Sequence, residues 1–446
     1  MTTTSQGFAA LPVKLIPTIK NIQYLIWLYF WLLIFEGALR KWVVPQLSEP
    51  LLIIRDPVVI VTYFLALKGG VFPKDIFTKM IIYLAFFSCL GGLVTVIISD
   101  TSLTVTFFGL RTNFLHLPLI FLIPKVFSLE DVKKLGRWLL LLAGPMALLM
   151  IYQFNSPPDA FINRGAGIDA MQLDGGTLGK IRPPGTFSFI TGVAQYFPLV
   201  TSFVLYGLVQ SKIYPKWLLS AAGLSLVLAL AVSVSRTAIG SVAVVLISLM
   251  VVLLIRPALV GKSYKFLVLS GLVGFGVNSI PSFNQGIEVL NNRVENANAF
   301  EVNSGGIVSR FLYGFLEPFY NTAQLPLLGY GLGMGTNAGS VLLTGKAKFL
   351  LAEGEWARVV FESGLVLGLL YIVLRIALVG WMGGLCIKSA AAGNILPLLL
   401  FGACAINILN AQFGQPTTLG FCVLGGGLCL ASRQIKSYSQ VLLEIR

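Results

Sequence analysis

Hydrophobic runs of about 20 residues recur along almost the whole chain, separated by short stretches rich in charge, Pro or Gly. As an α-helix, a run of this length matches the ~30 Å hydrocarbon core of a bilayer. The runs are too long, and alternate too little, for the strands of a membrane β-barrel. We therefore predict an all-α polytopic membrane protein, a single transmembrane domain over residues 1–446. The pattern predicts about 12 transmembrane helices, at Asn21–Ala38, Leu51–Leu67, Met80–Ser99, Leu103–Ile123, Trp138–Phe154, Phe189–Val209, Trp217–Val234, Thr237–Ile255, Tyr264–Ile280, Trp356–Ile387, Ile395–Ala411 and Thr417–Ala431.

Two longer polar stretches interrupt the runs, at residues 155–188 and 281–355. The second carries two amphipathic segments whose apolar side chains recur at helical spacing. Such segments usually pack on a helix bundle or lie on the membrane surface. We therefore predict short interfacial helices in the second stretch. The apolar positions are Ile287, Leu290 and Val294 in one segment and Val308, Phe311, Phe315 and Phe319 in the other.

The composition agrees with a membrane protein and limits the chemistry. Of the 446 residues, 56% are hydrophobic and 11% are charged, whereas soluble proteins carry about 25% charged residues. The five cysteines lie inside apolar runs without metal-type spacing, and His116 is the one histidine. Such cysteines usually act as buried small hydrophobes. We therefore expect no metal, no cofactor and no Ser–His triad.

The basic residues predict the orientation of the helices. With a cytoplasmic N-terminus, every inner segment carries Lys or Arg, as the positive-inside rule requires. Both termini are then cytoplasmic, and the stretches 155–188 and 281–355 are large loops on the outer face. Of the 18 basic residues assigned inside, 14 are Lys; of the other 14, 10 are Arg. The outer face and the membrane interior thus favour the planar guanidinium, which grips phosphate oxygens in pairs.

An arginine inside an apolar helix is costly and marks a candidate functional site. The alternative is that these arginines pair with acids for structural reasons. The acids available for such pairs also lie outside or within the membrane: Glu36, Asp56, Glu317 and Glu362. The contrast between a Lys-rich and an Arg-rich face remains under either interpretation.

Three short motifs place arginines near outer helix ends. The segment FEGALRKWVVP brings Glu36, Arg40 and a lysine to one helix end, and the RDP motif places Arg55 where it can face Glu36. In RPPGTFSF, the prolines and a glycine form a rigid turn that holds Arg182 at a helix entrance. In SVSRTAIGS, a tight hairpin places Arg236 at the start of a helix, where the dipole and the free N–H groups favour an anion. These arginines are candidate phosphate-binding residues.

Two further motifs follow in the second outer stretch. LGYGLGMGTN (Leu328–Asn337) lacks the GK[ST] ending of a nucleotide-binding loop, so it predicts a tight backbone turn near a sugar or the membrane. AEGEWARVVFESGLVLG (Ala352–Gly368) places Glu353 and Glu355 before a long helix. Acids at a helix N-terminus commonly complement the dipole, but both are also candidates for a general base on the outer face.

Taken in order, these motifs resemble those of the O-antigen polymerase and O-antigen ligase superfamily. The Arg182 motif, the SRT turn, the GYGLGMG segment and ExExxRxxxExGxxxG (Glu353–Gly368) carry the resemblance, and FEGALRKW and RDP are similar to segments of its exopolysaccharide-polymerase branch. The resemblance implies a GT-C-like, metal-independent membrane glycosyltransferase of the bacterial inner membrane. Such enzymes transfer a glycan from an undecaprenyl-pyrophosphate carrier to an acceptor hydroxyl on the periplasmic face.

The resemblance also implies roles for residues of this chain. Arg182 and Arg236 would bind the pyrophosphate, with Arg310 and Arg358 as further candidates, and a glutamate would serve as the base of an inverting single displacement. Ligases of the superfamily have a histidine where this chain has Glu353, which favours a polymerase. Supporting residues on the outer face would be Glu36, Arg40 and Arg55. The expected partners are a lipid-linked oligosaccharide, membrane lipids, and a chain-length regulator or a flippase, with no nucleic acid.

Three alternatives stay open from the sequence. The first is an O-antigen ligase that transfers glycan to a lipid or protein acceptor. The second is a transporter or flippase for an anionic solute, which would show inverted repeats and broken helices near the membrane midplane; the sequence shows no convincing internal repeat. The third is a scaffold without catalytic activity in an envelope-synthesis complex.

Overall fold

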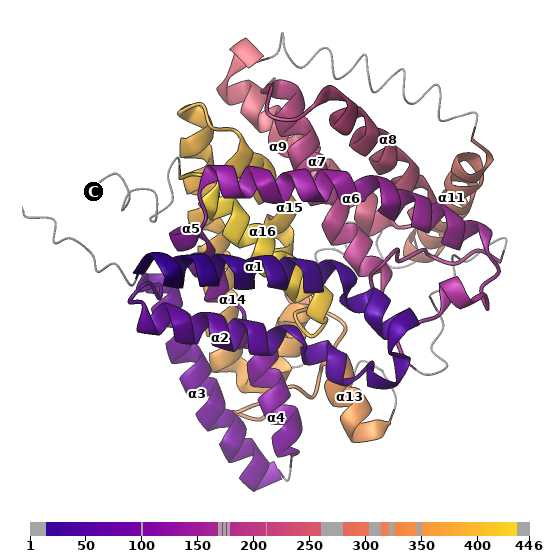
Figure 1. Cartoon of the computed structure of the whole chain (residues 1–446). Helices are drawn as coiled ribbons and strands as arrows, with labels where there is room; N and C mark the ends of the chain where they lie inside the picture. Colours follow the sequence, from indigo (N-terminus) through magenta and orange to yellow (C-terminus); the bar gives the residue numbers. More distant parts are fainter. Residues whose placement is uncertain are drawn as a thin grey trace, which may run out of the picture.

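The described part of the chain is all-helical in the computed structural model, and it contains no β-strand (Figure 1). The structure describes residues 15–99, 101–167, 172, 175, 179–210, 212–259, 280–302, 314–320, 325–345 and 350–434. The α-helices are α1 (Leu15–Ala38), α2 (Arg55–Lys68), α3 (Ile76–Ser99), α4 (Leu103–Leu110), α5 (Leu119–Val126), α6 (Leu129–Asn155), α7 (Ile190–Val209), α8 (Lys216–Ser233), α9 (Arg236–Ile255), α11 (Pro281–Val302), α13 (Asn337–Thr344), α14 (Glu355–Ala391), α15 (Leu396–Asn410) and α16 (Pro416–Ala431).

Nine helical segments in these ranges are long and apolar enough to cross a membrane. A polytopic α-helical membrane protein is thus supported, while the count of twelve is not confirmed. α15 and α16 have only 15 and 16 residues, and the predicted span Tyr264–Ile280 lies, except for Ile280, outside the described residues. The fourth span joins α4 to α5 through a π-helical turn, η4 (Arg111–Leu115).

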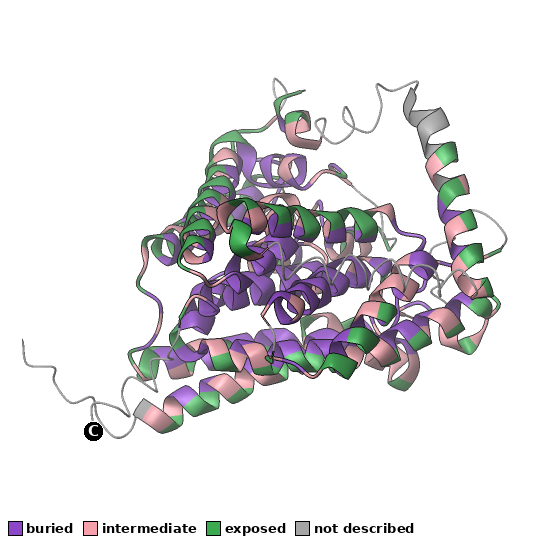
Figure 2. Cartoon of the chain, turned by 90° about the horizontal axis from the view of Figure 1, so that it is seen from above, coloured by how far each residue is buried: buried purple, intermediate pink, exposed green. Residues whose placement is uncertain are grey.

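α7 forms the centre of the bundle, and 94% of its most apolar window is buried. Five helices pack against α7, namely α6, α8, α9, α15 and α16. Figure 2 shows buried residues concentrated at this centre. α3 and α4 extend away from it at the lower left of Figure 1, and they carry exposed large side chains such as Phe86 and Phe107.

Helix α14 is broken near its start, where the sequence predicts one continuous span from Trp356 to Ile387. Gly364 has φ +80° and ψ 167°, which interrupts the helix. The chain folds back there, because a Cβ added at Gly368 would lie only 2.6 Å from the Cα of Val360. A Cβ added at Gly364 would collide with the carbonyl oxygen of Leu327. Two helical pieces therefore form a hairpin at a position that only glycine fits.

Replacing Gly364 with alanine is expected to destabilise the fold strongly. The variant would combine a left-handed φ with a backbone collision, and strain of this kind costs about 1–3 kcal/mol or more. Thermal unfolding of the purified protein in lipid nanodiscs should show a clear fall in Tm. Gly380→Ala is the matched control, because it lies in the same helix and no atom lies within 4 Å of the added Cβ. An unchanged Tm for Gly364→Ala would contradict the hairpin.

Candidate functional site

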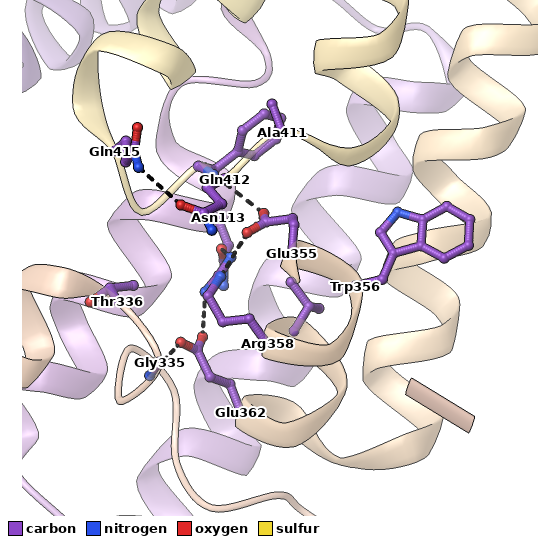
Figure 3. A network of polar contacts seen from close by, with 12 residues as sticks. Asn113, Gly335, Thr336, Glu355, Trp356, Arg358, Glu362, Ala411, Gln412 and Gln415 are labelled. Carbon is purple, nitrogen blue, oxygen red and sulfur yellow. Dashed lines mark hydrogen bonds and ion pairs between the residues drawn. The ribbon is translucent and has the colours of Figure 1, made fainter. Parts of the chain in front are cut away.

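Three residues of the first piece of α14 share one face because they are spaced i, i+3 and i+7. Arg358 donates from Nε to Glu355 Oε2 (2.7 Å) and from Nη1 to Glu362 Oε2 (2.7 Å). Its Nη2 donates to Asn113 Oδ1 on η4 (2.8 Å) and to Glu355 Oε1 (3.0 Å). Figure 3 shows Arg358 lying between the two carboxylates. We call Asn113, Glu355, Arg358, Glu362 and Arg375 the α14 cluster.

Arg375, on the second piece of α14, completes this cluster. Its Nη1 donates to Glu355 Oε1 (2.8 Å), a contact that is possible only because the helix folds back at Gly364. All four ionic side chains are buried, and two arginines balance two carboxylates. A buried, neutral and fully hydrogen-bonded ion cluster holds segments together and does not attract a further anion. Arg358 therefore fits the alternative in which a buried arginine pairs with acids to stabilise the fold and does not bind phosphate.

The structure separates the two candidate bases. Glu355 is buried, and both of its oxygens accept hydrogen bonds from Arg358, while Oε1 also accepts one from Arg375. Glu353, two residues earlier, is exposed. Its main-chain carbonyl accepts a hydrogen bond from Gln412 Nε2 (2.5 Å), which fixes the backbone but leaves the carboxylate open to solvent.

A further carboxylate that the sequence did not single out as a base lies beside Glu353. Partial burial of Glu317, in the 3₁₀ turn Glu317–Phe319, raises the pKa of its carboxyl group, and the negative charge of Glu353 raises this pKa further. The main-chain N–H of Gly354 acts in the opposite direction. Glu317 therefore retains a proton to a higher pH than an ordinary glutamate does.

This raised pKa predicts a pH dependence of stability. Because the folded state binds the proton more tightly than the unfolded state, Glu317 contributes stability at low pH that is lost as pH rises through the raised pKa. Between about pH 4 and pH 7, the Tm of the native protein should fall relative to that of Glu317→Gln. In a Glu353→Gln background this difference should shrink, since one cause of the shift is gone. Parallel Tm curves at all pH values would contradict the assignment.

A second buried network joins α1 to α2, and it confirms the predicted contact between Arg55 and Glu36. Arg55 Nε lies 3.2 Å from Glu36 Oε2, and Arg40 Nη1 lies 3.4 Å from Glu36 Oε1. Arg40 also donates to Ser188 Oγ (3.0 Å), and Arg55 Nη2 donates to the carbonyl of Pro416 at the start of α16 (2.5 Å). The motifs FEGALRKW, RDP and RPPGTFSF thus meet at one end of the bundle.

The network continues through residues that the sequence did not assign to the site. His116 lies between Tyr29 and Asp56: its Nδ1 is 3.0 Å from the Tyr29 hydroxyl, and its Nε2 is 2.9 Å from Asp56 Oδ1. Arg111 binds both oxygens of Asp56. We call Tyr29, Glu36, Arg40, Arg55, Asp56, Arg111 and His116 the α1–α2 cluster. Because Arg111 and Asn113 share the turn η4, this turn connects the two clusters.

The loop that holds Arg182 packs on the end of α1. Gly185, at φ +61°, accepts a hydrogen bond from Lys41 Nζ (2.6 Å), and its N–H donates to Gln153 Oε1 (2.9 Å). Lys41 is buried, whereas Arg182 itself is half-buried. The rigid turn that the prolines predict is therefore present, and it brings Arg182 to the side of the bundle where the α1–α2 cluster lies.

Neither cluster includes the remaining candidates, Arg236 and Arg310. Arg236 is half-buried at the first position of α9, after Val234 in the left-handed conformation and Ser235, whose hydroxyl caps Ala238 N–H. This confirms the predicted tight hairpin. Arg310 lies outside the described residues, as do Val308 and Phe311 of the second amphipathic segment, while the first segment forms α11.

The two clusters differ in net charge, which decides where an anion is favoured. The α1–α2 cluster contains three arginines and two carboxylates, and Lys41 adjoins it; the α14 cluster is balanced. An anionic ligand is attracted to an uncompensated positive charge. The geometry therefore favours the side of α1, α2 and the Arg182 loop for an anionic ligand.

The glycine-rich segment has a structural role that follows from its backbone. Gly329, Gly331 and Gly333 all have positive φ, as a tight turn requires. The N–H of Gly331 donates to the main-chain carbonyl of Glu362 (3.2 Å), and the N–H of Gly335 donates to Glu362 Oε1 (2.9 Å). This segment therefore supports the α14 hairpin and ends at a crevice beside Arg358.

Neither the scan against protein-family models nor the search of curated proteins found a match to this chain. Within the described ranges, no three His, Cys, Asp or Glu side chains are grouped in a way that could hold a metal ion. The interpretation of the site therefore depends on its own geometry and on the order of its motifs.

Proposed function

We propose that the protein is a membrane glycosyltransferase that polymerises undecaprenyl-pyrophosphate-linked oligosaccharide repeat units into O-antigen or exopolysaccharide on the predicted outer, periplasmic face. The observation that carries the proposal is the convergence of motifs that are far apart in sequence. Glu36 and Arg40 contact Arg55 and Ser188, and the glycine-rich segment binds Glu362. We infer that these motifs contribute residues to one site, although they are far apart in the sequence.

The two sides of this region suit the two halves of the reaction. The α1–α2 cluster has three arginines and two carboxylates, so its net positive charge, next to the loop that carries Arg182, suits a lipid pyrophosphate as leaving group. Arg236 is retained as a further phosphate ligand. The acceptor hydroxyl oxygen forms a bond to the anomeric carbon while the bond from that carbon to the pyrophosphate oxygen breaks. The leaving oxygen keeps the electron pair, and the hydroxyl proton passes to a carboxylate. This single displacement inverts the anomeric carbon and requires no ATP.

Of the two predicted bases, the exposed Glu353 suits proton transfer and the buried Glu355 suits positioning. A base must reach the acceptor hydroxyl within hydrogen-bond distance, and Glu355 is already held by Arg358 and Arg375. Glu317, beside Glu353, retains a proton more readily. We assign the base role to Glu353.

One observation favours the transporter alternative, namely the break of α14 at Gly364. Transporters often bind solutes at broken helices. Here, however, the ionic groups beside the break are already paired with one another. A solute anion would have to displace a buried carboxylate, which is costly.

A deletion strain tests the proposal against its alternatives. Loss of a polymerase should leave single-repeat carriers in the membrane, whereas loss of a ligase should leave full-length polymer that is not transferred. Purified protein in proteoliposomes should elongate lipid-linked repeat units without metal. Movement of an anionic solute across the vesicle without any elongation would overturn the proposal in favour of a transporter.

A further inference from the structure

The loop between α15 and α16, Ala411–Gln415, was not assigned any role from its sequence. Its supporting helices are short: 15 and 16 residues reach about 22–24 Å at 1.5 Å per residue, less than the ~30 Å of a bilayer core. The loop also lies level with the interior of α14, because Arg375 Nη2 donates to the carbonyl of Ala411 (2.9 Å). It is therefore recessed from the outer helix ends.

Two buried arginines from distant elements clamp this loop. Arg375 binds the carbonyl oxygens of Asn407, Ile408 and Ala411 at the end of α15, and its guanidinium carbon lies 4.0 Å from the centre of the Phe413 ring. Arg55 binds the carbonyl of Pro416 at the other end. Fixing both ends removes the entropic cost that a mobile loop would add to binding.

The clamped loop forms one wall of a crevice that opens beside Arg358. The crevice is narrow, and amide, hydroxyl and main-chain groups reach its lining, although most of the exposed lining surface is apolar. The lining residues are Gly335, Thr336, Asn337, Ala352, Arg358, Gln412, Gly414 and Gln415. Arg358, the one charged residue of this lining, is neutralised by Glu355 and Glu362. Figure 3 shows Gln412 and Gln415 on the loop side and Thr336 across from them.

The two glutamine amides keep hydrogen-bonding capacity. Gln415 Nε2 donates to Gln412 Oε1 (2.9 Å), and Gln412 Nε2 donates to the carbonyl of Glu353. An amide offers two N–H donors and two acceptor lone pairs, so these bonds orient both groups without exhausting them. Both side chains are half-buried, which leaves the remaining positions open to a ligand.

We propose that the Ala411–Gln415 loop is a glycan subsite, in which Gln412 and Gln415 bind sugar hydroxyls, and that Arg55 and Arg375 are its positioning residues. The inference rests on the proposed function and identifies the part of the proposed site that binds the glycan. A neutral lining with both donors and acceptors matches hydroxyl groups, and the balanced charge disfavours phosphate. The contact from Gln412 to the carbonyl of Glu353 places this subsite next to the assigned base.

Photo-crosslinking tests the subsite independently of turnover. We would introduce p-benzoylphenylalanine in place of Gln412, Gln415 or, as a control at the predicted cytoplasmic end, Gln210. Irradiated cells that make the lipid-linked repeat unit should give carbohydrate-positive adducts at positions 412 and 415 and none at 210. A strain that lacks the lipid-linked glycan should lose the signal. If adducts form at positions 412 and 415 but the protein does not elongate the glycan, the subsite stands and the proposed polymerase activity is wrong. If the protein elongates the glycan but adducts at these positions do not exceed the level at position 210, only the proposed subsite is wrong.

Alanine variants provide a second test that does not depend on whether the bulky p-benzoylphenylalanine variants fold. Gln412→Ala and Gln415→Ala should each raise the KM for the lipid-linked repeat unit about tenfold, the loss of one or two hydrogen bonds, with little change in Tm. Gln415→Ala should leave kcat almost unchanged, whereas Gln412→Ala also loses the hydrogen bond to the main-chain carbonyl of Glu353 and should lower kcat as well. Gln210→Ala should change none of these. The inhibition constant of inorganic pyrophosphate should stay the same in both loop variants. If it rises instead while the KM for the glycan donor is unchanged, the crevice is an anion site and the proposal is wrong.

Discussion

Replacing Arg358 with methionine is expected to lower the free energy of unfolding by about 3–5 kcal/mol, the usual cost of removing one partner from a buried ion pair. The substitution leaves two buried carboxylates, on Glu355 and Glu362, with only Arg375 to balance them. It also removes the hydrogen bond that ties α14 to Asn113 on η4. Equilibrium unfolding in lipid nanodiscs, followed by circular dichroism, would measure the loss.

A compensating variant separates the charge effect from simple loss of packing. In Arg358→Met with Glu362→Gln, one cation and one anion are removed together, so Glu355 and Arg375 remain as a balanced pair. This double variant should recover at least half of the lost stability. Lys133→Met is the control, because its pair with Glu130 is more exposed and should contribute no more than about 1 kcal/mol. If Arg358→Met costs no more than this control, the α14 cluster does not stabilise the fold.

Most of the helices were predictable from the sequence because a bilayer core requires every main-chain polar group to be bonded internally. Long apolar runs therefore indicate helices, as α3 and α9 illustrate. The break in α14 at Gly364 was not predictable in the same way, since a single glycine is also tolerated inside a helix. It depends on the carbonyl of Leu327, a contact that comes from a distant part of the chain.

The contacts between charged residues of the candidate site could be predicted from the sequence. The contacts made by its uncharged polar residues could not. Arg55 and Glu36 were expected to pair because opposite charges lie at neighbouring helix ends. Asn113 and His116 lie within a mostly apolar segment, and only tertiary contacts bring them to Arg358 and Asp56. A buried polar group must find a partner, but the sequence does not say which partner it finds.

Replacing Glu353 with glutamine is expected to lower kcat about 10²–10⁴-fold, the usual contribution of a general base, with little effect on Tm. The carboxylate is exposed, and the contact that orients this segment uses the main-chain carbonyl, which glutamine retains. Initial rates of chain elongation with purified protein and lipid-linked repeat units would measure kcat. Glu288→Gln, an exposed site on α11, should leave the rate unchanged.

The matched variant Glu355→Gln tests which of the two glutamates is the base, because they are only two residues apart. Glu355 is buried and held by Arg358 and Arg375, so its neutralisation should lower Tm and the yield of folded protein. Per folded molecule, Glu355→Gln should lose less activity than Glu353→Gln. The opposite pattern, with a stable and inactive Glu355→Gln and an active Glu353→Gln, would move the base to the α14 cluster. The arginines that hold Glu355 would then act on a reacting group as well as on the fold.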